Sequence, residues 1–150
     1  MMDMNSEVVH TPPRAAATVV LLRDAPLGPE VFMLKRHGRS SVLAGAHVFP
    51  GGKVDALDAG PAALSLLDES QLPVFAEGSR YIAAIREVFE ESGVLLAHGV
   101  DRPTIDKASA MLREGHAFDV VMHALSLRLD ARSLLAWSRW ITPQRPTVTN

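Results

Sequence analysis

A nine-residue segment, 86–94, most constrains what this chain can form. It reads Arg-Glu-Val-Phe-Glu-Glu-Ser-Gly-Val and places one arginine and three glutamates within its first six residues. The glutamates are spaced i, i+3 and i+4, so in an α-helix their side chains fall within an arc of roughly 100°. Apolar residues fall on nearly the opposite side, which predicts an amphipathic helix with an acidic face. The acidic residues are Glu87, Glu90 and Glu91, and the apolar ones are Ile82, Ile85 and Phe89.

Three carboxylates on one helix face repel one another. A divalent cation such as Mg²⁺ or Mn²⁺ would remove the repulsion, because these hard ions prefer oxygen ligands. Arg86 is placed to pair with one carboxylate and fix its orientation. The alternative is an ordinary solvated acidic face, and the spacing alone favours that alternative.

A second motif lies upstream, where residues 49–55 read Phe-Pro-Gly-Gly-Lys-Val-Asp. Adjacent glycines let the backbone approach a ligand or ion closely. Together the two motifs resemble the Nudix box, which runs Gly, five residues, Glu, seven residues, then Arg-Glu-apolar-any-Glu-Glu-any-Gly-apolar. Segment 86–94 matches the whole second half, and Gly52 begins the first half. Asp58 stands where the family has Glu, so no family role is carried over to it.

The spacing between the two halves differs from the family pattern. Here 27 residues, 59–85, separate Asp58 from Arg86 in place of the family's seven. This insertion is similar to that of a Nudix subgroup that includes peroxisomal coenzyme A diphosphatases and related bacterial proteins.

The resemblance implies a fold, a cofactor and a reaction. The fold is α/β (α+β), a Nudix-type α/β/α sandwich around a mixed β-sheet. The reaction is hydrolysis of the diphosphate of a nucleoside diphosphate linked to another group, with coenzyme A or acyl-coenzyme A ranked first, and ADP-ribose or a dinucleotide second. Arg86 orients a motif carboxylate and Glu87 is a candidate base. The cofactor is Mg²⁺ or Mn²⁺, and its implied ligands are Glu87, Glu90, Glu91 and the carbonyl of Gly52.

Basic residues flank the glycine turn and are candidates for holding substrate phosphates. The group consists of Lys35, Arg36, His37, Arg39 and Lys53, and those singled out for substrate binding are Arg36, Arg39 and Lys53. The stretch from Arg36 to Gly52 partly resembles a coenzyme A signature that precedes the box in some Nudix enzymes. The alternative is a solvated hairpin end, and the sequence favours neither.

Composition excludes several other classes of protein. With 150 residues and 47% hydrophobic content the chain is long enough for one domain with a real core. Its net charge of −2 argues against a nucleic-acid partner, and the absence of cysteine excludes disulfides and thiolate metal sites. No membrane span or signal peptide is predicted, so a cytoplasmic protein is the default. A homodimer is a further expectation.

The pattern along the chain predicts a loose lead-in at 1–14 and a Nudix domain at 15–150, with the insertion at about 59–80. Strands are expected at 16–23, 30–36, 47–49 and 94–96. Helices are expected at 62–67, 79–92, 105–113 and 118–127, and Gly93 is the expected helix stop. Segment 133–142 is expected to approach the sheet as a strand, with Trp137 and Trp140 in core or edge packing.

A Nudix domain normally continues with further strands beyond this point, so the sheet is expected to be incomplete at its C-terminal side. Unpaired strand edges favour self-association, and lost burial lowers stability. We therefore expect weak catalysis and marginal stability. Two other classes of function remain open, a nucleotide-binding module without catalysis and a non-functional fragment.

Overall fold

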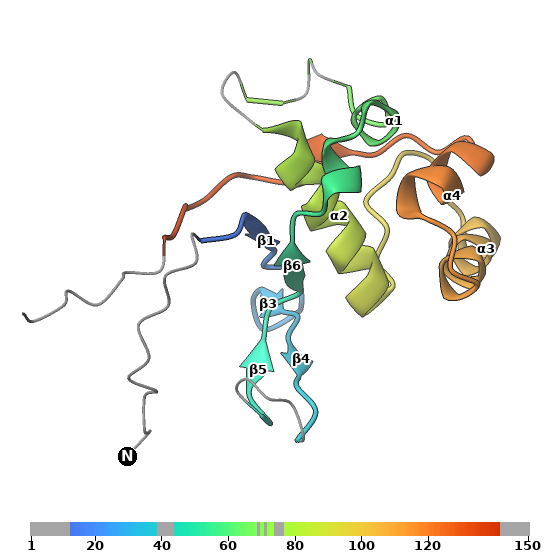
Figure 1. Ribbon diagram of the computed structural model, residues 1–150. Helices are drawn as coiled ribbons and strands as arrows, with labels where there is room; N and C mark the ends of the chain where they lie inside the picture. Colours follow the sequence, from blue (N-terminus) through green and yellow to red (C-terminus); the bar gives the residue numbers. More distant parts are fainter. Residues whose placement is uncertain (1–12, 39–43, 69, 71, 74–76, 142–150) are drawn as a thin grey trace, which may run out of the picture.

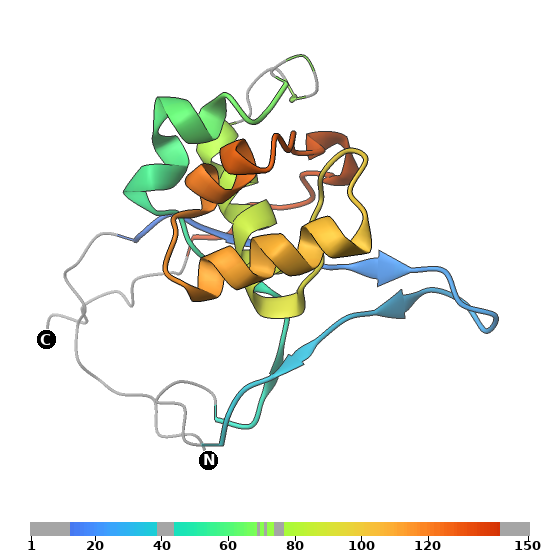
Figure 2. The ribbon, with the colours of Figure 1, turned by 90° about the vertical axis from the view of Figure 1, so that its right-hand side faces the viewer.

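The computed structural model describes residues 13–38, 44–68, 70, 72–73 and 77–141. It confirms an α+β fold in which short β-ladders lie on one side of a central helix and further helices lie on the other (Figures 1 and 2). No helix in the described ranges combines the length and the apolar composition that crossing a membrane requires.

The central helix is α2, Gly78–Ser92, and it confirms the helix expected at 79–92. It ends where predicted, because Gly93 takes the left-handed conformation with φ of 74°. The Gly93 amide donates to the carbonyl of Phe89 over 2.9 Å, which closes the last turn.

Two apolar clusters pack against opposite sides of α2. The larger contains Ile82, Ile85 and Phe89, and joins α2 to α1 (Pro61–Leu64), α3 (Arg102–Arg113) and α4 (Phe118–Ala124). The smaller contains Ala84 and Val88 of α2 with Val19, which follows β1 (Ala16–Thr18). The helix is therefore held between the helical layer and the strands, with its acidic residues near its C-terminal end.

The strands form three two-stranded antiparallel ladders, and no parallel pair occurs within the described ranges. β1 pairs with β6 (Gly51–Lys53), β2 (Leu22–Arg23) with β3 (Glu30–Val31), and β4 (Leu34–Lys35) with β5 (His47–Val48). The expected strand at 16–23 is divided because it changes partner. The Val19 amide donates to Pro50, whereas the carbonyl of Leu21 accepts from Phe32. The expected strand at 30–36 is divided in the same way between β3 and β4.

Three other expectations about regular structure are wrong. Residues 94–96 form no strand, although a single bridge joins Ala97 to Leu129 nearby. Helix α4 ends at Ala124 and not at residue 127. The 3₁₀ helix η3, Ala131–Ser133, opens the segment where a strand was expected, and residues 134–141 have no regular structure.

Both tryptophans of this last segment point away from the core. The exposed fractions of Trp137 and Trp140 are 90% and 89%, so the expectation that they pack in the core or at a strand edge is wrong. Aromatic residues at this spacing usually pack against a neighbouring element, but the described residues provide no strand beside this segment for the rings to cover. Most of the expected lead-in, 1–12, lies outside the described residues.

Replacing Ile85 by alanine should lower the free energy of unfolding by about 2–5 kcal/mol, the usual range for a deeply buried aliphatic side chain. Ile85 has no exposed surface and belongs to the larger cluster. Leu27→Ala is the control, because Leu27 is fully exposed and should change stability by less than about 0.5 kcal/mol. Urea unfolding measures both, and equal losses would contradict the position of Ile85 in the core.

Candidate active site

Arg86 lies at the centre of the site, with only 10% of its side chain exposed. Its guanidinium holds the Asp58 carboxylate with two hydrogen bonds of 2.9 Å, from Nε to Oδ1 and from Nη2 to Oδ2. Nη2 also donates to the carbonyl of Lys53 over 3.0 Å. Nη1 donates to Glu87 Oε1 over 2.9 Å and to Glu90 Oε2 over 3.3 Å. One arginine thus joins α2, the end of β6 and the segment that follows β6.

The paired carboxylate of Asp58 raises the pKa of Arg86 above its already high ordinary value, although burial opposes the shift. The guanidinium is therefore a permanent positive charge. It confirms the expectation that Arg86 pairs with a motif carboxylate, and it holds two of the three glutamates.

Asp58 is the residue that sequence reasoning missed. It lies in the 3₁₀ helix η1, Ala56–Ala59, and only 3% of it is exposed. Its Oδ2 also accepts the backbone amide of Asp55 over 2.8 Å, so each oxygen of the carboxylate has a partner. The shorter side chain reaches Arg86 although the family has Glu here. The available signal was its place in the first half of the box, together with the turn-forming Asp55 three residues before it.

The turn glycines lie against the glutamates. A Cβ atom on Gly52 would lie 2.3 Å from Oε1 of Glu87, so no larger residue fits there while the Glu87 carboxylate stays in place. The amide of Gly51 donates to Oε2 of Glu91 over 2.9 Å. The structure therefore brings both halves of the box together, with the glycine turn facing the acidic end of α2.

The cleft on the strand side has a volume of about 720 Å³. Its lining includes Glu91 and Gly51 at one end and Arg36 among residues of the β4–β5 ladder. Of the expected substrate-binding residues, Arg36 thus lines the cleft, whereas the side chain of Lys53 is exposed and is not among the lining residues. Arg39 lies outside the described residues.

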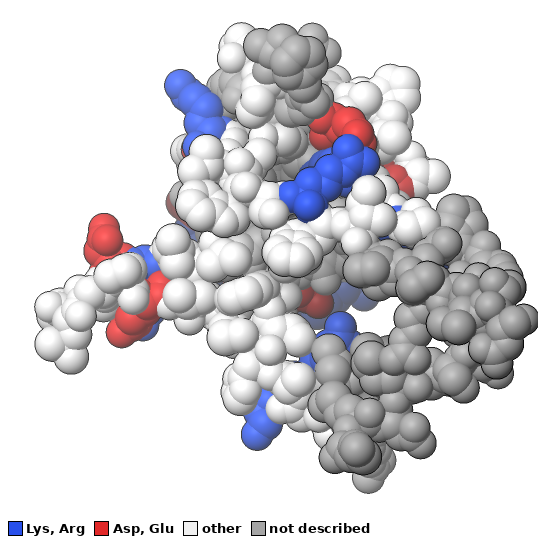
Figure 3. All heavy atoms as spheres, turned by 90° about the vertical axis from the view of Figure 1, so that its left-hand side faces the viewer, with Lys and Arg blue, Asp and Glu red and all other residues white. Residues whose placement is uncertain are grey.

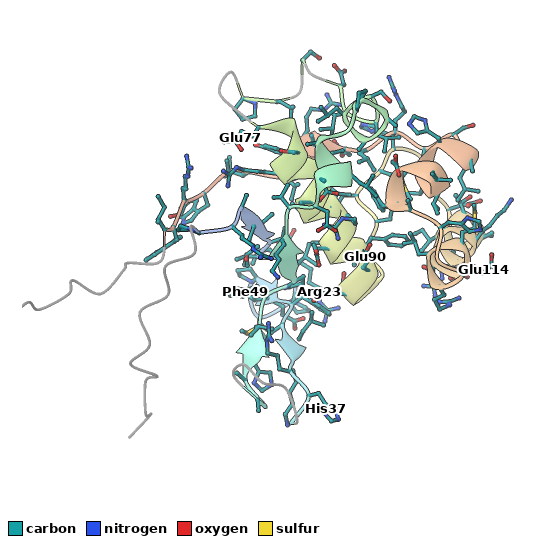
Figure 4. The ribbon with its side chains drawn as sticks, in the orientation of Figure 1. Arg23, His37, Phe49, Glu77, Glu90 and Glu114 are labelled. Atoms are coloured by element: carbon teal, nitrogen blue, oxygen red, sulfur yellow. The ribbon has the colours of Figure 1, made fainter. Side chains whose placement is uncertain are left out.

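A smaller cavity of about 230 Å³ lies on the other side of α2. Arg86 and Glu90 form part of its wall, with His116 and Asp119 from the connection into α4 and from α4 itself. Burial raises the pKa of Glu90, while the charge of Arg86 lowers it and the charge of Glu87 raises it. Glu90 and Glu91 therefore face different cavities, with Glu87 held between Arg86 and Gly52. Figure 4 shows Glu90 on the side of α2 that faces the helical layer.

The donor chemistry fits a hard divalent cation, because three carboxylates lie within one helical turn and a half of one another. The hydrogen bonds described above use one oxygen of each carboxylate, Oε1 of Glu87 and Oε2 of Glu90 and Glu91. As placed, no three His, Asp or Glu side chains among the described residues surround a common point that would hold an ion. The assignment of Glu87, Glu90, Glu91 and Gly52 as metal ligands stays a prediction.

Comparison with known proteins gives the family. No family model matches the chain. The acyl-coenzyme A diphosphatase NUDT19 of Gallus gallus is 30% identical over 93% of this chain and 52% of its own length. A Caenorhabditis elegans protein named as a nudix hydrolase is 32% identical over 87% of this chain and 39% of its own. The crystal structure of a NUDIX hydrolase from Alicyclobacillus acidocaldarius superposes with a TM-score of 0.66 and 33% identity, covering 82% of this chain and 59% of that one. This chain belongs to the Nudix hydrolase superfamily.

Membership of this superfamily explains the α+β fold. It also explains why the two motifs resemble a Nudix box of the kind found in coenzyme A diphosphatase-like proteins. The chain spans about half the length of the curated relatives it matches.

Changing Asp58 to asparagine should lower the free energy of unfolding by about 3 kcal/mol. This is the lower end of the range for breaking a buried ion pair, because Glu87 and Glu90 remain beside Arg86. Asp55→Asn is the matched control, since 66% of that side chain is exposed and its carboxylate lies 3.7 Å from Arg86. Urea unfolding of both variants measures the difference. A loss for Asp58→Asn no larger than for Asp55→Asn would show that the buried pair is not what holds the site.

Changing Gly52 to alanine should displace the Glu87 carboxylate and lower the free energy of unfolding by about 1–3 kcal/mol, the usual range for overpacking. Gly38→Ala is the control, because a Cβ at Gly38 meets no atom within 4 Å. Thermal unfolding of both variants, with NMR chemical shifts of labelled glutamate, reports stability and carboxylate environment. Unchanged Glu87 shifts in Gly52→Ala would contradict the close approach.

Proposed function

We propose that this chain is a divalent-metal-dependent hydrolase of the diphosphate in a nucleoside diphosphate linked to another group. The observation that carries the proposal is the Arg86 network. It holds Glu87, which lies against Gly52, and Glu90, while Glu91 accepts the Gly51 amide and lines a cleft that also contains Arg36. Anchored carboxylates next to a cleft with a cationic wall suit a substrate whose charge is concentrated in a diphosphate.

The relatives favour coenzyme A or an acyl-coenzyme A as the substrate, with ADP-ribose or a dinucleotide second. The Gallus gallus relative is named as an acyl-coenzyme A diphosphatase, and the insertion between the halves of the box supports the same subgroup.

In this proposal Glu87, Glu90, Glu91 and the carbonyl of Gly52 would hold Mg²⁺ or Mn²⁺, and the bound ion would neutralise developing negative charge and lower the pKa of bound water. Arg86 keeps Glu87 and Glu90 in position through its own hydrogen bonds. A water oxygen forms a bond to one phosphorus, the bond from that phosphorus to the bridging oxygen breaks, and Glu87 accepts the proton of the water. Gly52 leaves room for the Glu87 carboxylate beside the turn.

A nucleotide-binding module without catalysis is the second candidate. The observation in its favour is that Glu90 and Glu91 face different cavities, while one guanidinium nitrogen holds both Glu87 and Glu90. Such a module would bind nucleotide in the cleft without turning it over.

Changing Glu91 to glutamine should lower kcat by about 10²–10³-fold, the scale for losing one preorganised electrostatic group, and should weaken Mn²⁺ binding. Glutamine keeps an oxygen that can accept the Gly51 amide, so the change removes mainly the charge. Glu114→Gln is the control, on the exposed end of α3. Phosphate-product assays on a panel of nucleotide diphosphates and calorimetric Mn²⁺ titration measure both effects. Equal Mn²⁺ affinity in wild type and Glu91→Gln would refute the metal assignment, and nucleotide binding without turnover would favour the module.

A further inference from the structure

Lys35 and His47 form a basic pair at the far end of the strand-side cleft. They are directly opposite each other in the antiparallel β4–β5 ladder, so their side chains project to the same face. Both residues are exposed and both line the cleft. Figure 3 shows blue Lys or Arg side chains at the lower end of the face it draws, where histidine is coloured white with the other residues. The Lys35 ammonium and the His47 imidazole, two hydrogen-bond donors from neighbouring strands, therefore both line the strand-side cleft.

This pair is separate from the carboxylate end of the cleft. His47 and Gly51 are four residues apart with a bend at Pro50 between them, so their Cα atoms lie at most about 13 Å apart. The Gly51 amide donates to Glu91, so the Glu91 carboxylate lies beside the Gly51 end of the cleft. A diphosphate is compact, because its two phosphorus atoms are joined by a single oxygen. A ligand whose diphosphate lies beside Glu91 would therefore present another of its groups to Lys35 and His47.

Phe49 lies between the two ends and also lines the cleft. It is partly exposed, at 36%, and so offers an aromatic surface to a ligand. In Figure 4 Phe49 lies to the left of the other two residues, at a height between that of His37, at the end of the hairpin, and that of Glu90, at the acidic end of α2. The order along the cleft is thus a basic pair, an aromatic ring and a carboxylate.

Neither Lys35 nor His47 has a carboxylate partner within 4 Å among the residues that the structure describes. The Lys35 ammonium is therefore not neutralised by an ion pair of the described fold. A lysine ammonium is a compact charge that commonly binds phosphate, and an imidazole N–H can donate beside it.

We propose that Lys35 and His47 bind a phosphate monoester of the ligand that is separate from the scissile diphosphate. This proposal rests on the proposed function for its reaction, and it selects substrates that carry a third phosphate on the nucleoside. The Phe49 ring would contact the nucleobase or sugar between the two anionic groups.

The test compares ligands that differ by one phosphate. Calorimetry measures binding of adenosine 3′,5′-bisphosphate and of AMP to the full chain, and product assays compare coenzyme A with 3′-dephospho-coenzyme A in Mn²⁺. Lys35→Gln and His47→Gln should each weaken binding of the bisphosphate about tenfold, the scale of one charge-assisted hydrogen bond, and leave AMP binding unchanged. In kinetics they should raise KM for coenzyme A and leave kcat unchanged. Lys107→Gln, on the exposed face of α3, is the matched control and should change neither ligand.

The outcomes separate this proposal from the proposed function. Discrimination between the two ligands that is lost in Lys35→Gln or His47→Gln supports the pair, even if no substrate is turned over and the hydrolase proposal fails. Wild type that binds AMP and the bisphosphate equally overturns the pair, whether or not diphosphate hydrolysis is observed. Equal weakening of both ligands in the variants also overturns it, because the pair would then serve the group that the two ligands share.

Discussion

The buried pair of Arg86 and Asp58 is the interaction on which the rest of the site depends. It joins the two halves of the box across the 27 residues that separate them in the chain. Withdrawing two charges from water is expensive, so such a pair contributes little net stability compared with well-packed apolar residues. Its geometry is demanding, however, because each Asp58 oxygen meets one guanidinium nitrogen. We infer that the pair mainly fixes where α2 lies relative to η1, and that breaking it would leave a buried charge.

The same guanidinium explains why the glycine turn approaches α2 so closely. One nitrogen binds the carbonyl of Lys53, which ends β6, and so ties the strand to the helix. At this separation a side chain on Gly52 would collide with Glu87, and a side chain on Gly51 would collide with the backbone of Ala17 and Thr18. The glycines are therefore required by the packing of β6 between β1 and α2, in addition to any contact with a ligand. The two glycines of the motif are needed for packing, whether or not they also contact a ligand.

The sequence predicts features that depend on residues close together in the chain better than features that depend on contacts between distant segments. The helix at 79–92 and its stop at Gly93 were predictable, because periodicity and a left-handed cap are local signals. The division of the strand at 16–23 was not, since it depends on which distant segments supply its partners. Asp58 was missed because the shorter side chain argued against a role, and only the position of η1 shows that it reaches Arg86. The exposed Trp137 shows the same limit, because an aromatic residue signals burial only when something lies beside it.

The arrangement of charge bears on how a cation would enter the site. Arg86 already offsets part of the repulsion between Glu87 and Glu90 through its ion pairs with both carboxylates. A divalent ion would have to bind through oxygens that these contacts leave available, or displace part of the Arg86 network. Displacement is costly, because Arg86 also holds Asp58 and the Lys53 carbonyl. Binding beside Arg86 keeps those contacts and adds positive charge where burial works against the ionised form of Glu90. The electrostatics therefore favour an ion that binds to the carboxylates beside Arg86 and leaves the hydrogen bonds of the guanidinium in place.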